Sequence, residues 1–197
     1  MDFIPPEILI EAYTMGLFPM AHEDGGLYWH DPDPRAIFPL QDLRPDRKTA
    51  AMMRSGKWRI SMDASFEEVI RACAAREETW IDERIMRSYL LLHEHGHAHS
   101  VEVWEGQELV GGIYGVAIGA AFFGESMFNR RPNAGKVAFH GLVDHLRGRG
   151  FMLFDTQYIN PFTERLGAVE IAKLEYMRSL KAALKVRPAG SLWHTNG

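Results

Sequence analysis

The chain has 197 residues, a hydrophobic fraction of 46% and a formal net charge of -4, which suits one large domain or two small ones. Its ordinary charged content of 24% argues against intrinsic disorder, collagen-like repeats and coiled coil, and no apolar run is long enough for a membrane-spanning helix. The single Cys73 allows no intrachain disulfide and the first residues do not resemble a signal peptide, so we expect a soluble, cytoplasmic protein.

Helices dominate the first part of the predicted secondary structure. Proline in the first turn and a closing glycine are typical of a helix over residues 7–15. Residues 17–20 continue in extended form. The Gly-, Asp- and Pro-rich residues 22–39 predict an ordered loop, because their prolines exclude a helix interior. Capping residues and apolar faces predict two more helices, one from Asp63 or Ser65 to about residue 75, the other from Asp82 to His95.

The pattern then changes to strands that form a β-meander. The remaining elements are expected in this order: strands at 99–104, 109–118 and 120–127, a helix at about 134–147, a strand at 151–154 and a helix at about 173–184. This succession predicts an α+β fold, with residues 1–60 as a smaller leading lobe.

Charge is distributed unevenly along the chain. Residues 1–40 and 61–110 carry net charges of -6 and -7, whereas residues 41–60 and 111–197 carry +4 and +5. Because electrostatic fields in salt are local, the basic blocks can meet phosphates whatever the total charge is. The alternative is that they are solvated helix faces. The acidic stretches could equally hold a cationic partner.

Four histidines stand at alternate positions, His93, His95, His97 and His99. On a continuous strand they would share one face and could bind a metal ion. Gly96 and the helical pattern before it argue against a continuous strand, and cysteine or carboxylate ligands are missing at the usual spacing. We therefore expect no metal, and a helix-to-strand turn with hydrogen-bonded histidines.

Two acidic residues follow apolar strands. Burial of Glu125 would raise its pKa or demand a partner, although it could instead be a loop carboxylate that caps the next helix. Asp155 and Gln157 would share one side of a strand, with Asn160 three residues further on. They could orient a polar substrate group, or form an ordinary strand-end turn. Trp80 is either a core residue or a stacking platform.

Eight strings occur in order along the chain: residues 16–19, 29–36 (W-H-D-P-D-P-R-A), 79–81, 93–104, 108–116, 123–128, the pair 155 and 157, and 166–168. Together they closely resemble the leucyl/phenylalanyl-tRNA–protein transferases. The resemblance runs from about residue 9 to residue 171 and so covers most of the chain.

The resemblance implies an enzyme that moves leucine or phenylalanine, and less readily methionine, from aminoacyl-tRNA to acceptor proteins with an N-terminal Arg or Lys. The products would enter bacterial N-end-rule degradation. It also implies a GNAT-like C-terminal catalytic domain, here residues 61–197, after a smaller N-terminal lobe, here residues 1–60. No cofactor and no metal are expected, and we expect a monomer.

The resemblance assigns catalysis to Asp155 and Gln157, with help from Glu125. We hypothesise that Asp155 polarises Gln157, which accepts a hydrogen bond from the attacking amine and orients it, while Glu125 neutralises or positions the basic acceptor terminus. Trp80 would stack on the terminal adenosine of tRNA. The other expected substrate-binding residues are Ile113, Phe123 and Met127, in the pocket for the aminoacyl side chain, together with Ser126 and Asn160.

Three features depart from the family pattern. The chain begins almost at the first helix, where family members have a longer N-terminal segment. Met20 stands where an aromatic residue is usual, and Gly135 stands where serine is common.

Two other functions compete with this interpretation. An acyltransferase that uses acyl-CoA is disfavoured, because residues 130–136 lack the loop spacing that holds a pyrophosphate at a helix N-terminus. A non-catalytic RNA-binding module fits the basic blocks but leaves the acidic residues without a role.

Overall fold

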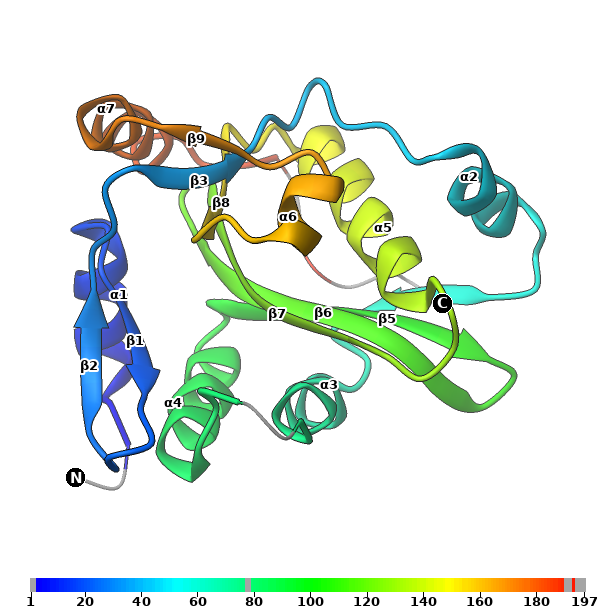
Figure 1. The fold of residues 1–197 in the computed structure, drawn as a ribbon, viewed down its shortest axis with the longest axis horizontal. Coiled ribbons are helices and arrows are strands. Elements are labelled where there is room, and N and C mark those ends of the chain that lie inside the picture. The colour runs from blue at the N-terminus through cyan, green and yellow to red at the C-terminus, as the bar shows by residue number, and fades with distance from the viewer. Residues whose placement is uncertain (1–2, 77–78, 190–192, 194–197) are drawn as a thin grey trace.

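The computed structural model describes residues 3–76, 79–189 and 193, which form one large sheet with helices on both faces (Figure 1). The sheet has seven strands in the order β4-β5-β6-β7-β8-β3-β9, and β1 and β2 form a separate two-stranded sheet. Neighbouring strands of the large sheet are antiparallel except β7 and β8, which are parallel. Within the described residues, no helix combines the length and apolar character needed to cross a membrane.

The longest strands lie in the centre of the sheet. The strands are β1 (Phe18–Ala21), β2 (Leu27–His30), β3 (Arg35–Phe38), β4 (Arg59–Met62), β5 (Ala98–Glu105), β6 (Glu108–Ile118), β7 (Ala121–Asn129), β8 (Leu153–Gln157) and β9 (Val169–Ile171). The helices are α1 (Pro6–Thr14), α2 (Arg47–Arg54), α3 (Phe66–Ala74), α4 (Glu83–Glu94), α5 (Ala134–Arg149), α6 (Pro161–Arg165) and α7 (Lys173–Ala183). The predicted α+β class is confirmed, with a mixed sheet and flanking helices.

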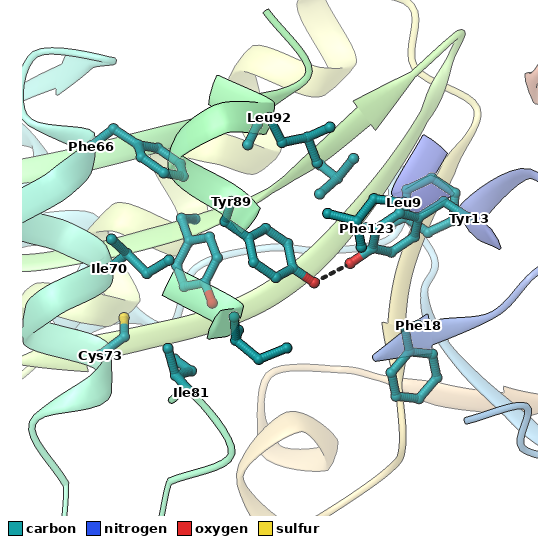
Figure 2. Packing of buried hydrophobic residues seen from close by; sticks show 14 of the residues in the cluster. Leu9, Tyr13, Phe18, Phe66, Ile70, Cys73, Ile81, Tyr89, Leu92 and Phe123 are labelled. Carbon is teal, nitrogen blue, oxygen red and sulfur yellow. Dashed lines mark hydrogen bonds between the residues drawn. The ribbon is translucent and has the colours of Figure 1, made fainter. Parts of the chain in front are cut away.

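Each face of the sheet carries its own hydrophobic core. Helices α3 and α4 pack on one face of β5, β6 and β7, and α5 packs on the other (Figure 1). In the first core, Tyr13 of α1 and Tyr89 of α4 point their hydroxyls toward each other beside Phe123 of β7 (Figure 2). In the second, the rings of Phe139 and Phe154 lie 5.8 Å apart. Because both faces are covered, β6 reads in the sequence as a continuous apolar run.

Most helices and the meander match their predicted positions, because local signals define them. Asp82 caps α4 by accepting a hydrogen bond from the backbone N–H of Ile85 at 2.9 Å. Helix α5 continues past Gly148, since it is Gly150 that adopts the left-handed conformation that ends the helix. The elements confirmed are α1, α3, α4, α5, α7 and the meander of β5, β6 and β7.

The prediction of a loop over residues 22–39 is wrong, because this segment contains β2 and β3. Strand β3 pairs with β8 and β9, whose residues Asp155 and Ile171 lie far along the chain, so no local pattern indicates the pairing. Strand β8 reaches Gln157, so Asp155 and Gln157 lie within the strand and not beyond it. Elements α2, β4, α6 and β9 have no predicted counterpart. The division of the chain into lobes at residue 60 stays a prediction.

A β-bulge interrupts the pairing of β6 with β7 at Glu125. Tyr114 pairs with Ser126 and Gly115 pairs with Gly124, which leaves Glu125 without a partner residue on β6. A bulge shifts the alternation of a strand by one residue and so reorients a side chain. Here it turns Glu125 toward the face of the sheet that α1 and α4 cover.

Gly115, next to the bulge, and Gly148, in α5, differ in their tolerance of a side chain. A Cβ at Gly115 would lie 2.2 Å from the carbonyl oxygen of Phe123, so Gly115→Ala should lower the free energy of unfolding by at least about 2 kcal/mol. A Cβ at the exposed, helical Gly148 meets nothing within 4 Å, so Gly148→Ala should raise it by about 0.5–1 kcal/mol. Urea denaturation of both variants checks the pair. Equal stabilities would contradict the close approach of β6 to β7.

Candidate active site

A buried ion pair joins β3 to β8. The guanidinium of Arg35 donates two hydrogen bonds to the carboxylate of Asp155, from Nε to Oδ1 at 2.9 Å and from Nη2 to Oδ2 at 2.7 Å. The two side chains are 1% and 0% exposed. Arg35 also donates to the carbonyl oxygen of Gly16 at 2.8 Å, and the hydroxyl of Tyr176 donates to Asp155 at 2.8 Å. Each side-chain nitrogen and oxygen of this pair thus has a hydrogen-bond partner, as buried charges require.

The same carboxylate fixes the backbone of Gln157. The N–H of Gln157 donates to Asp155 Oδ1 at 2.8 Å, and Gln157 has a φ of 67°, in the left-handed region that residues with a side chain rarely adopt. The side-chain amide of Gln157 points elsewhere and donates from Nε2 to Glu125 Oε1 at 3.0 Å. Asp155 therefore contacts Gln157 through the backbone, whereas Glu125 contacts its side chain. In this structure the side-chain amide that Asp155 was expected to polarise is hydrogen-bonded to Glu125 instead.

Two tyrosines complete the surroundings of Glu125. The hydroxyl of Tyr13 donates to Oε1 at 2.6 Å, that of Tyr89 donates to Oε2 at 3.1 Å, and the two hydroxyls contact each other (Figure 2). Burial and the carboxylate raise the pKa of both tyrosines well above the usual value, so both hydroxyls stay protonated. Three oxygen–oxygen contacts need three protons, but two hydroxyls supply only two. When Glu125 is protonated, its Oε2 donates to Tyr89 and Tyr89 in turn donates to Tyr13, so all three contacts have a proton.

The carboxyl of Glu125 accordingly resists ionisation. Burial raises the pKa of Glu125 from 4.5 to about 7, against the opposing hydrogen bonds from Tyr13, Gln157 and Tyr89. Near neutral pH this side chain therefore exists in both protonation states. Such a group can accept or release a proton without a large cost in free energy.

A cavity of about 710 Å³ opens beside Glu125, between β7 and the end of β8. Its walls combine aromatic and aliphatic side chains with a few polar groups, which is typical of a site for a small molecule or a substrate side chain. Arg76 and Arg130 add positive charge to the lining. The apolar lining residues include Phe38, Phe128, Phe139, Phe154, Phe162 and Leu166.

The structure brings most of the predicted site residues together. Six of them line the cavity: Trp80, Ile113, Glu125, Ser126, Met127 and Asn160. Asp155 and Gln157 are not in the lining and reach it through Glu125. Phe123 is not brought to the cavity. It is fully buried on the face of β7 that α1 and α4 cover, with its ring centroid 4.8 Å from that of Tyr13. Its physical contribution is to support Tyr13.

Two further predicted positions have structural partners of their own. The amide oxygen of Asn160 caps α6 by accepting hydrogen bonds from the backbone N–H groups of Phe162 and Thr163, at 2.9 and 3.0 Å. Gly135 donates from its backbone N–H to the side chain of Asn129 at 2.6 Å, and a Cβ there would lie 2.8 Å from that same oxygen. A serine at position 135 would therefore require Asn129 to move.

Four residues of the site are not found by reasoning from the sequence, namely Tyr13, Arg35, Tyr89 and Tyr176. Arg35 lies in the string W-H-D-P-D-P-R-A, but nothing in the spacing pairs it with a carboxylate 120 residues away. Tyr13 and Tyr89 resemble ordinary core residues of amphipathic helices. Their hydroxyl groups are the one feature of the sequence that points to a polar contact, because the hydroxyl of a buried tyrosine needs a hydrogen-bond partner.

The side chains of three of the four histidines are hydrogen-bonded around the junction of α4 and β5, in line with the prediction. His93 Nδ1 contacts the carbonyl oxygen of Ala98 at 2.7 Å, and His95 Nδ1 contacts that of Leu91 at 2.8 Å. His99 contacts both Asp63, at 2.7 Å, and the carbonyl oxygen of Gly96, at 3.1 Å.

The raised pKa of Glu125 predicts a pH-dependent stability. The folded state holds a proton on Glu125 that the unfolded state releases above pH 4.5, so this residue's contribution to stability is full below pH 4.5 and is lost as pH rises through about 7. Glu125→Gln should remove this decline, changing the slope of unfolding free energy by up to about 1.4 kcal/mol per pH unit. Denaturation between pH 4.5 and 8 checks it, with the exposed Glu170→Gln as control. A wild-type slope in Glu125→Gln would contradict the assignment.

The sequence matches known proteins over nearly all of its length. A family profile described as leucyl/phenylalanyl-tRNA protein transferase matches residues 37–181, and one for the N-terminal domain of that transferase matches residues 4–33. The leucyl/phenylalanyl-tRNA–protein transferase of Ruegeria pomeroyi is 51% identical over 92% of this chain and 87% of its own length. Those of Rubrobacter xylanophilus and Chlorobium luteolum are also 51% identical, over 93% and 94% of this chain and 96% and 98% of theirs.

A solved domain (DUF2156) from Agrobacterium fabrum covers 93% of this chain and 58% of its own, with a TM-score of 0.38 and 11% identity, too low a likeness to argue from. The two profiles and the curated relatives cover nearly all of the chain. The chain belongs to the leucyl/phenylalanyl-tRNA protein transferase family.

Proposed function

We propose that this chain transfers leucine or phenylalanine, and less readily methionine, from aminoacyl-tRNA to the N-terminal Arg or Lys of acceptor proteins. The observation that carries the proposal is the contact between Gln157 and Glu125 at the edge of an apolar cavity. Family membership indicates the class of reaction, an aminoacyl transfer. The amide of Gln157 and the carboxyl of Glu125 are groups that can bind and deprotonate an amine. The products would enter N-end-rule degradation.

The proposed reaction is aminolysis of an ester. The acceptor's α-amine attacks the carbonyl carbon, a C–N bond forms, and the C–O bond to the terminal ribose of tRNA breaks. The amine must first lose a proton, since its free pKa is near 8. Starting from its ammonium form, the nitrogen loses two protons in all: the ribose oxygen takes up one and the other is released to solvent, so the protons balance.

We assign three roles to the polar network. Gln157 accepts a hydrogen bond from the amine through its amide oxygen, because its amide nitrogen already donates to Glu125. Glu125 polarises that amide, attracts the cationic acceptor terminus and takes its proton, which a pKa of about 7 allows. Asp155 acts one step removed, by holding the backbone of Gln157 in its left-handed conformation. It is a positioning residue.

The cavity suits the other substrate. Ile113 and Met127 offer an apolar lining for a leucyl or phenylalanyl side chain, and Trp80 offers a ring for the terminal adenosine. Met20, where an aromatic is usual, lies on β1 and packs against the same core as Trp80. Arg76 and Arg130 supply positive charge for the phosphates next to that adenosine.

The basic block over residues 41–60 suits the body of the tRNA. Its cations are all exposed and most lie on or beside α2: Arg44, Arg47, Lys48, Arg54, Lys57 and Arg59. Exposed guanidinium and ammonium groups are the usual phosphate contacts of a nucleic-acid surface.

The proposal includes a GNAT-like catalytic domain acting as a monomer. The mixed sheet with its parallel β7/β8 pair is consistent with this fold. Use of acyl-CoA is not part of the proposal, because Asn129 occupies the backbone N–H of Gly135 in the first turn of α5, where a pyrophosphate would need free N–H groups.

A transfer assay tests the proposal. The full chain is incubated with radiolabelled leucyl-tRNA and acceptors that differ only in an N-terminal Arg, Lys or Asp. We expect label on the Arg and Lys acceptors alone. Gln157→Ala and Glu125→Gln should each reduce the rate by about a hundredfold, because the amine loses its orientation or its proton acceptor.

The control is Asp144→Asn, a carboxylate-to-amide change on the exposed side of α5, which should transfer at the wild-type rate. Binding of leucyl-tRNA without transfer would favour the RNA-binding module. Transfer only from acyl-CoA, or equal rates for Gln157→Ala and wild type, would contradict the proposal.

A further inference from the structure

A second cluster of side chains lies outside the cavity, where three elements meet. Asp63, in the loop between β4 and α3, His93, near the end of α4, and His99, on β5, place their potential ligand atoms within 4.8 Å of one another. Asp63 and His99 are almost fully buried, with side chains 4% and 7% exposed. We propose that Asp63, His93 and His99 bind a divalent transition-metal ion of the Zn²⁺ type.

Both histidines are held in the way that metal-binding imidazoles usually are. His93 contacts the carbonyl oxygen of Ala98 with Nδ1, which makes Nδ1 the donor and leaves the lone pair of Nε2 available. His99 contacts the carbonyl oxygen of Gly96 with Nε2, which leaves Nδ1 as the ligand atom. A hydrogen bond from the second nitrogen to a backbone carbonyl fixes the tautomer and orientation of a ligating histidine.

Asp63 is fixed as firmly. Its Oδ1 accepts a hydrogen bond from the backbone N–H of Ser100 at 2.8 Å, so Oδ2 is the oxygen that would bind the ion. Its φ of 53° lies in the left-handed region, where an aspartate is held only by surrounding contacts. Oδ2 lies 2.7 Å from Nδ1 of His99, a distance at which the two atoms share a proton. A metal ion would replace that proton.

The ligand set determines the class of ion. Two imidazole nitrogens and one carboxylate oxygen suit Zn²⁺ and its neighbours in the transition series, and not Ca²⁺ or Mg²⁺, which prefer oxygen. At bond lengths of about 2.1 Å, the ligand atoms of a tetrahedral ion lie roughly 3.4 Å apart, so Asp63 Oδ2 and His99 Nδ1 must separate slightly while the more distant ligand atoms approach. Asp63 and His93 line a groove of about 540 Å³ between α3 and α4, from which water can supply the fourth ligand.

The site would tie three segments together: the β4–α3 loop, the end of α4 and β5. Bound metal should therefore stabilise the folded state, since the unfolded chain does not assemble the three ligands. This role is independent of the proposed transfer reaction.

Isothermal titration calorimetry of the full chain with ZnCl₂ tests the proposal. We expect one ion per chain, a rise in Tm on binding, and visible d–d absorption when Co²⁺ replaces Zn²⁺. Asp63→Asn, which keeps the shape and the bond from Ser100, should weaken binding at least tenfold and abolish the rise in Tm. His93→Gln should do the same, so the test survives if one variant fails to fold.

Two matched variants serve as controls. His95→Gln alters an exposed neighbour in the same histidine run. His22→Gln removes one member of a separate pair, His22 and His30, whose Nε2 atoms lie 3.0 Å apart. Both should bind as the wild type does. Absence of binding at micromolar Zn²⁺, binding unaffected by Asp63→Asn and His93→Gln, or loss of binding in His22→Gln would overturn the proposal.

Discussion

The buried ion pair between Arg35 and Asp155 is the interaction on which the rest of the candidate site depends. Arg35 is held by the carbonyl oxygen of Gly16, and its guanidinium lies between the rings of Phe18 and Tyr176, at 4.8 and 4.6 Å. Removing one partner of such a pair costs about 3–5 kcal/mol, because the other charge stays buried and unpaired. The pair thus ties the segment after α1, strand β3, strand β8 and helix α7 to one another.

Two local backbone features turn this rigidity into an arrangement of polar groups. Asp155 holds Gln157 in a left-handed conformation at the end of β8, and the bulge on β7 turns Glu125 toward Gln157. Neither conformation suits a regular strand. Both persist because hydrogen bonds and packing on neighbouring elements compensate for them, as is common where strain is kept at a functional site. The two side chains meet only because both deviations occur.

The sequence predicts the local elements well and the long-range ones poorly. Caps, closing glycines and period-two alternation define α4 and the meander, since their causes lie within a few residues. Strand β3 has four residues, and its partners come from distant parts of the chain, so no pattern in residues 22–39 indicates it. For the site, the sequence pattern indicates the acidic residues Glu125 and Asp155, but it does not indicate their partners Tyr13 and Arg35, because burial and long-range pairing are properties of the fold. The place of Phe123 was missed because the bulge changes which residues of β7 face the cavity.

The central claim is that the ion pair acts on the reaction by positioning Gln157, and not merely by stabilising the fold. The most direct test compares Arg35→Met, Asp155→Leu and the double variant, measuring both the free energy of unfolding and the rate of leucyl transfer. Each single variant should lose about 3–5 kcal/mol of stability, and the double variant should recover most of it, since an apolar pair can replace a buried ion pair. We predict that transfer stays slow in the recovered double variant, because nothing holds the Gln157 backbone. A stable double variant that transfers leucine at the wild-type rate would contradict the account.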